Sequence, residues 1–211
     1  MAAEETDTGS GPVTLRRSVP AGAERRAAEL CWGAFGRKLG PALNPPDKAV
    51  PFLAARLDTD RAVCAFAGGE LVAFAEYQLG GQKPAKGAVI AVLRTYGWIR
   101  GLYRLALLAL FENRPKRGRL VVAGIAVDPG SRGHGIGSLL VEELAAIAAE
   151  RGCREIRLDV IDTNPRAKAL YERLGFATVR TTRTPYLRRL LGFGAVTTMC
   201  RGVAPKGLPA Q

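Results

Sequence analysis

The sequence predicts an α/β fold, on the evidence of a strand followed by a helix, a hairpin before them and a second strand after them. Residues 120–127 are apolar and rich in β-branched side chains, which is typical of a strand covered on both faces. From Ile136 the apolar residues recur with the period of a helix. Upstream, residues 61–79 hold two β-prone runs joined by Gly68-Gly69, and downstream residues 156–161 again read as a strand.

The composition is that of a globular chain with a basic excess. Of the 211 residues, 47% are hydrophobic and 24% are charged, which predicts one domain that can bury a full core. The formal net charge of +12 favours polyanionic ligands, but a solvated basic surface is preferred over nucleic-acid binding because no DNA- or RNA-binding module is recognised. The cysteines are scattered, so neither a metal site nor a disulfide framework is indicated. They are Cys31, Cys64, Cys153 and Cys200.

The N-terminal third is expected to hold a leader, a strand and two helices. Residues 1–12 are acidic, small and polar, which predicts a disordered leader on a cytoplasmic protein. Residues 13–19 predict a first strand and residues 20–39 a helix, which Gly40-Pro41 should stop. A second, shorter helix is expected at about 48–57.

The C-terminal part should complete the sheet. Residues 177–182 predict a strand, residues 185–191 a short basic helix, and residues 194–201 the last strand. Residues 204–211 read as a loose tail, which leaves 13–203 as a single domain.

The loop at residues 132–137 is the candidate ligand site. It has three glycines in alternation, and only His134 and Ile136 carry bulky side chains over its backbone. Unpaired N–H groups at a helix N-terminus favour an anion, most naturally a phosphate, and Arg132 adds a forked cation. A tight strand-to-helix turn is the alternative interpretation of the same glycines. The candidate binding residues are Arg132, Gly133, His134, Gly135, Ile136, Gly137 and Ser138.

Two motifs in this region resemble those of the GCN5-related N-acetyltransferases. The first is motif A, whose signature is Arg or Gln, two residues, Gly, one residue, then Gly or Ala; here it is Arg132, Gly135 and Gly137. The second, in residues 162–176, resembles motif B. Its matching residues are Asn164, Ala167, Leu170, Tyr171, Gly175 and Phe176. Both motifs in the right order, about 20 residues apart, make the resemblance specific.

The resemblance implies a mixed, mostly antiparallel central sheet of about seven strands flanked by helices. It also implies an enzyme that transfers an acetyl group from acetyl-CoA, as cosubstrate, to a primary amine of a small molecule or protein, without a metal. A non-catalytic acyl-CoA-binding or interaction module with the same fold is the alternative from another class.

By the same resemblance, several residues take defined roles. The splayed strand end at Ile125, Ala126 and Val127 offers backbone groups to the pantetheine and an N–H to the thioester carbonyl, as an oxyanion donor. Asn164 hydrogen-bonds the pantetheine or the phosphate arm. Tyr171 matches the general acid that protonates the departing thiolate.

The general base is the least defined role. A lysine-type amine has a pKa of about 10.4, so a base or a water chain must take a proton before the amine attacks. Many members of the family carry an acidic residue on the strand that ends at motif A, but residues 119–127 contain none. Glu76 on the preceding strand is the best acidic candidate, with a surface ion pair as the alternative. His134 suits phosphate contact or solvent exposure better.

Aromatic residues on the first two predicted helices are candidates for the acceptor site. In the family the first two helices flank the acceptor site, so Trp32, Phe35 and Phe52 are candidates to line it, with core packing as the alternative.

Residues 80–118 are expected to be a helical insertion before the acetyl-CoA-binding strand, with helices at 88–94 and 96–111. Arg100 and Arg104 break the apolar run, which is far shorter than the ~20 residues of a membrane span. A lid over the acceptor site, a homodimer surface and an interfacial membrane helix remain open.

Overall fold

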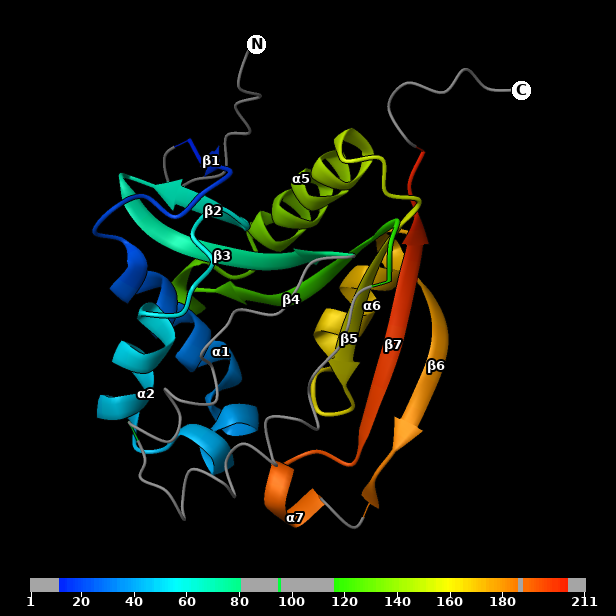
Figure 1. The fold of residues 1–211 in the computed structure, drawn as a ribbon. Helices are drawn as coiled ribbons and strands as arrows, with labels where there is room; N and C mark the ends of the chain where they lie inside the picture. Colours follow the sequence, from blue (N-terminus) through cyan, green and yellow to red (C-terminus); the bar gives the residue numbers. More distant parts are fainter. Residues whose placement is uncertain (1–11, 81–94, 96–115, 186–187, 205–211) are drawn as a thin grey trace.

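The computed structural model describes residues 12–80, 95, 116–185 and 188–204, and one seven-stranded sheet runs through them (Figure 1). The strand order is β1-β2-β3-β4-β5-β7-β6. The strands are β1 (Thr14–Arg16), β2 (Ala62–Ala67), β3 (Glu70–Leu79), β4 (Arg119–Val127), β5 (Glu155–Ile161), β6 (Ala177–Arg183) and β7 (Ala195–Gly202). Within this sheet β4 and β5 form the one parallel pair, which confirms the predicted mixed, mostly antiparallel sheet.

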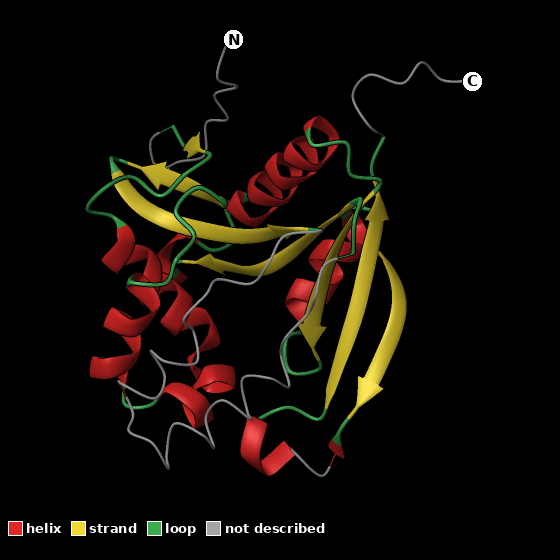
Figure 2. Ribbon diagram, in the orientation of Figure 1, coloured by secondary structure: helices red, strands yellow, loops and turns green. Residues whose placement is uncertain are grey.

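Helices cover both faces of the sheet (Figure 2). One face carries α1 and α2, which pack against each other, and the opposite face carries α5 and α6. The described helices are α1 (Glu24–Leu43), α2 (Pro46–Ala54), α5 (Ile136–Glu150), α6 (Pro165–Arg173) and α7 (Arg188–Leu191), with a 3-10 turn, η1, at Pro129–Ser131.

Two apolar clusters follow from the alternation of side chains along the strands. Ala73 and Ala75 of β3 face α5, whereas Phe74 between them belongs to the cluster beneath α1. On α5, Leu140 and Leu144 are fully buried, as the helical period predicts. Burial of one such leucine contributes about 1.5–3 kcal/mol, so α5 is held to the sheet mainly by this face.

The first helix is longer than the sequence predicts. Gly40-Pro41 does not stop α1, which continues to Leu43. Pro41 removes one backbone donor, but the Asn44 N–H still reaches the Gly40 carbonyl at 2.9 Å, and Leu43 is buried. Packing therefore outweighs the local breaker. The other N-terminal boundaries also shift: β1 has three residues rather than seven, and α2 begins at Pro46, the N1 position that proline favours.

The last three strands lie in the sheet in the order β5-β7-β6. β7 pairs antiparallel with both β5 and β6, so β6 is the edge strand, and all seven of its residues are exposed. Of the helix expected at 185–191, the described residues include the four of α7.

Several expectations fall on residues outside the described ranges. These are the leader at 1–11, the insertion helices at 88–94 and 96–111, and the tail from 205 onward. Among the described helices, none is long and apolar enough to cross a membrane.

Candidate active site

The site is created where β4 and β5 separate (Figure 1). The two strands are in register from Arg119 and Glu155 only as far as Val121 and Arg157, although each strand continues beyond that pair. Past this point the facing edges no longer hydrogen-bond to each other. A cleft of about 180 Å³ occupies the gap. Its lining includes Ala34, Phe35, Gln78, Val121, Val122, Ala123, Gly124, Ile125, Leu158, Asp159, Val160, Ile161, Asn164, Ala167 and Tyr171.

A β-bulge in β4 lies at the start of this separation. Glu76 pairs with Gly124 and Tyr77 with Val122, so Ala123 is an extra residue without a partner on β3. Bulges bend a strand and increase its twist. The bulged residue lies two positions after Val121, the last β4 residue paired with β5, and we attribute the opening of the cleft to this bulge.

The cleft reaches both faces of the sheet. Leu158 and Val160 of β5 belong to the core beneath α5, and Asp159 between them points to the opposite face. The cleft lining includes Tyr171 from α6 and Phe35 from α1. One mouth of the cleft therefore lies beside α6 and the other beside α1.

The glycine loop has the geometry of a strand-to-helix turn. Gly133 and Gly135 have φ values of 89° and 75°, the left-handed region that glycine adopts without penalty. Among the described residues, no heavy atom lies within 4 Å of a Cβ built on either, so glycine is needed there for backbone conformation. Gly137 is different, because its Cβ would lie 3.3 Å from Leu170 Cδ2, so that side chain would have to shift by a few tenths of an ångström.

The predicted anion-binding residues are only partly arranged as expected. Residues 132–135 are exposed at the N-terminus of α5, where an anion can approach. The Ser138 N–H, however, already donates to the Gly135 carbonyl at 2.8 Å, so Ser138 adds no backbone donor for an anion. The Arg132 side chain donates from Nε to the Val127 carbonyl at 3.2 Å. That bond ties the loop to the end of β4 and leaves Nη1 and Nη2 outside it.

Motif B places Tyr171 in the cleft. Asn164 caps α6, its Oδ1 accepting from the Ala167 N–H at 3.2 Å, and Tyr171 follows two turns later. The phenol ring packs against Phe176 with centroids 5.9 Å apart. Burial raises the pKa of Tyr171 to about 12, so the hydroxyl is protonated at neutral pH. Because Asn164 Oδ1 already accepts the capping hydrogen bond, any hydrogen bond from this side chain to a ligand would be donated by its amide nitrogen.

Glu76 is half-buried on the α1-facing side of β3, opposite Gly124. Burial raises the pKa of its carboxyl to about 7, the Asp58 charge adds to the rise, and a backbone hydrogen bond from Asp58 opposes it. Burial raises the pKa of Cys31 on α1 to about 12, and the charge of the Glu76 carboxylate adds to this rise. Within the described chain Glu76 forms no ion pair.

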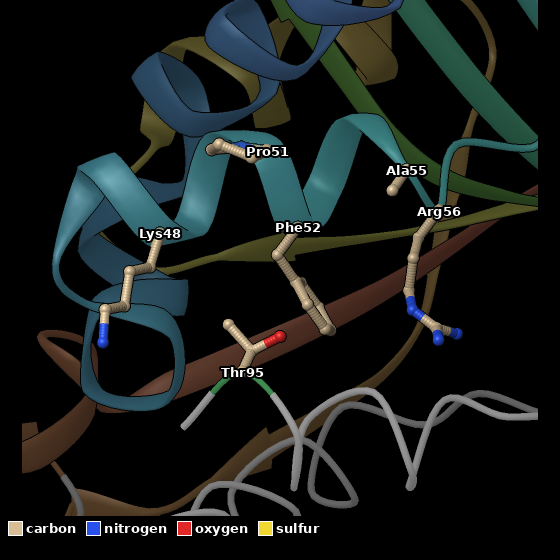
Figure 3. A pocket seen from close by; sticks show the side chains of 6 residues that line it. All are labelled: Lys48, Pro51, Phe52, Ala55, Arg56 and Thr95. Atoms are coloured by element: carbon tan, nitrogen blue, oxygen red, sulfur yellow. The ribbon is translucent and has the colours of Figure 1, made fainter. Parts of the chain in front are cut away.

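Of the three aromatic candidates on the first two helices, Phe35 lines the cleft. The Trp32 ring instead packs near Gly36 of its own helix. Phe52 lies in a separate hollow of about 460 Å³ beside α2, with Lys48, Arg56 and Thr95 (Figure 3).

Sequence reasoning missed Gln78, Ala123, Gly124 and Asp159 as cleft residues. Asp159 carried a signal, because it is a charged residue between the apolar Leu158 and Val160 of β5. No sequence signal indicated the bulge at Ala123.

Comparison with known proteins gives relatives over part of the chain. Thialysine N-epsilon-acetyltransferase from Bos taurus is 43% identical over 69 residues, which are 32% of this chain and 41% of that protein. Streptothricin acetyltransferase from Streptomyces lavendulae is 44% identical over 59 residues, 28% of this chain and 31% of that protein. The matched segments thus span less than half the length of these relatives.

Solved structures resemble the whole fold at low identity. The ribosomal-protein-S18-alanine N-acetyltransferase from Escherichia coli has a TM-score of 0.57 at 19% identity, covering 94% of this chain and 99% of its own. A GCN5-related N-acetyltransferase from Kribbella flavida has a TM-score of 0.58 at 16% identity, covering 90% and 98%. The family model described as the acetyltransferase (GNAT) family matches residues 28–176. The chain belongs to the GNAT acetyltransferase family.

Proposed function

We propose that the protein is an acetyl-CoA-dependent N-acetyltransferase that acts on a primary amine. The observation that carries the proposal is a cleft through the sheet with a protonated Tyr171 on its α6 side and Glu76 near its α1 side. Family membership supports the same reaction class. The names of the relatives specify acceptors for those proteins, namely thialysine, streptothricin and an alanine of ribosomal protein S18.

The residues present fit acetyl-CoA. The exposed loop of Arg132 to Gly135 at the N-terminus of α5 suits the pyrophosphate, because unpaired N–H groups and a guanidinium favour an anion. Backbone groups of Ile125 to Val127, on the edge of β4 that β5 has left, suit the pantetheine amides and the thioester carbonyl. When bound, acetyl-CoA supplies the thioester that is attacked.

The proposed reaction transfers one acetyl group, and the acceptor nitrogen loses two protons in the course of it. The neutral amine attacks the thioester carbon, the C–N bond forms, and the C–S bond breaks to release coenzyme A. Glu76 takes the proton that the ammonium must lose, directly or through water, since a carboxyl with a pKa of about 7 is ionised at slightly alkaline pH. Tyr171 donates a proton to the departing thiolate. Once the C–N bond has formed, the nitrogen loses its second proton, which returns to Tyr171 through water. Base and acid lie on opposite faces of the sheet, in keeping with two substrates that enter by opposite mouths.

The test is amine-dependent release of free thiol from acetyl-CoA by the purified protein. A panel of alkylamines, diamines, peptides and aminoglycosides should contain at least one acceptor, and mass spectrometry should find its acetylated product. A protein that binds acetyl-CoA by calorimetry but acetylates no member of the panel would instead support the non-catalytic module, which no comparison favours.

A further inference from the structure

A polar triad on β5 and β7 lies beside the cleft. The Thr198 hydroxyl donates to Asp159 Oδ1 at 2.7 Å and accepts from Arg157 Nη2 at 3.4 Å, and that nitrogen is 3.9 Å from the same carboxylate oxygen. Thr198 is buried and pairs with Asp159 across the two strands. The Asp159 carboxylate is therefore held in one position.

Asp159 alone carries a charge among the described residues that line the cleft. This is notable in a chain whose formal net charge is +12, because a basic protein repels a cationic acceptor over most of its surface. A fixed carboxylate inside a cleft attracts a cation more strongly than a surface carboxylate does, since less water screens it.

The position of Asp159 fixes which part of an acceptor it can meet. Asp159 points to the face on which α1 packs, and Phe35 of α1 lines the same cleft. A carboxylate and an aromatic ring in one cleft together favour an ammonium or guanidinium group. The nitrogen that attacks the thioester must be neutral, and Glu76 is already proposed to take its proton. Asp159 therefore suits a second cationic group, away from the reacting nitrogen.

We propose that Asp159, positioned by Thr198, binds a second positive charge on the acceptor, so that the substrate class is a diamine or another basic amine with two cationic groups. This inference rests on the proposed function and narrows it. Monoamines without a second charged group are then poor substrates, as are amines that carry a phosphate or carboxylate in place of the second cation.

The experiment compares cadaverine with pentylamine, which has the same chain without the second ammonium. Wild type should acetylate cadaverine with a kcat/KM at least about tenfold higher, the effect of one charge-assisted bond. Asp159→Asn should remove most of that advantage through KM, with kcat and the pentylamine kinetics little changed. Glu172→Gln, an exposed carboxylate on α6, is the matched control and should keep the advantage.

Thr198 tests the positioning role without removing the charge. Thr198→Val should raise KM for cadaverine and not for pentylamine, and Thr198→Ser, which restores the hydroxyl, should rescue it. An equal change for both amines in the Asp159 and Thr198 variants would overturn the inference, as would a wild type that treats the two amines alike. If wild type acetylates only neutral or acidic amines of the panel, the inference fails and the proposed function stands. If it acetylates no amine at all, both fail.

Discussion

The ring of Phe35 lies over Gly124 so closely that a Cβ at that glycine would fall 2.8 Å from Cε2 and 2.9 Å from Cζ. Both residues line the cleft, and Gly124 is the residue opposite Glu76. Because Gly124 has no side chain, the Phe35 ring of α1 can pack on β4 next to the proposed base, Glu76. The arrangement depends on one glycine, and this makes it testable.

Gly124→Ala should force the Phe35 ring out of its position. We expect a loss of about 1–3 kcal/mol in the free energy of unfolding from overpacking, and a higher KM for the acceptor. Thermal unfolding and steady-state kinetics measure the two effects. Gly33→Ala, at an open helical position on α1, is the control and should be neutral or stabilising. Adding Phe35→Leu to Gly124→Ala should recover stability; if it does not, the clash is not the cause.

Glu76 should set the acidic limb of the pH–rate profile. Activity should rise as the pH increases through about 7, where the carboxyl loses its proton, and Glu76→Gln should lack this limb and turn over ~10²–10⁴ times more slowly. A variant with an unchanged profile would assign the base to another group or to water.

The same carboxyl should affect stability in the opposite sense. Its pKa in the folded protein, about 7, is above the ordinary value near 4.3, so the folded state binds more protons between these pH values. Stability from this group is present below about pH 4.3 and is lost as the pH rises toward 7. Glu76→Gln should therefore be more stable than wild type at pH 8, by a few kcal/mol at most, and equal to it at pH 4. Denaturant titration at the two pH values measures this; equal stability at both would contradict the raised pKa.

Tyr171→Phe removes a hydroxyl and keeps the ring that packs on Phe176. We expect kcat to fall by ~10²–10⁴ with the affinity for acetyl-CoA little changed. Because burial raises the pKa of this phenol to about 12, no alkaline limb from Tyr171 should appear below about pH 10. Tyr77→Phe, in the core on β3, is the control and should leave kcat unchanged. A wild-type rate in Tyr171→Phe would return this residue to a packing role.

At Gly135 in the phosphate loop, a substitution tests the backbone conformation alone, because a Cβ there would meet no other atoms of the described chain. Gly135→Ala should cost about 1–2 kcal/mol of stability, because its φ of 75° is unfavourable for alanine. Gly135→Asn should cost less, since asparagine tolerates that region. Calorimetry should find weaker acetyl-CoA binding in the alanine variant if the loop conformation matters. Binding as tight as wild type in a folded Gly135→Ala protein would place the pyrophosphate elsewhere.

Local patterns predicted the elements that build the site. The β-branched run of β4, the switch to helical period at Ile136 and the glycine turn at Gly68-Gly69 each found the right element within a residue or two. The strand β4 was expected to be covered on both faces, but Ala123 is exposed in the cleft. Local sequence could not predict this, because the separation of β4 from β5 depends on pairing between strands far apart in the chain.

The same limit applies to the residues that were missed. Gly124 reads as one more small residue in a strand until Phe35, 89 positions earlier, is placed against it. The stop expected at Gly40-Pro41 followed propensity, which tertiary packing of Leu43 overrides. Glu76 was found by its residue type, whereas its raised pKa is a property of burial that only the fold supplies.

We propose that one cleft through the sheet receives acetyl-CoA from the α6 side and the amine from the α1 side. The decisive measurement is a crystal structure with a bisubstrate conjugate, in which an acetyl bridge joins coenzyme A to cadaverine. We expect the conjugate to pass between β4 and β5, with its sulfur within hydrogen-bonding reach of the Tyr171 hydroxyl and its amine chain beside Phe35. A conjugate that lies wholly on one face of the sheet, or outside the β4–β5 cleft, would contradict it.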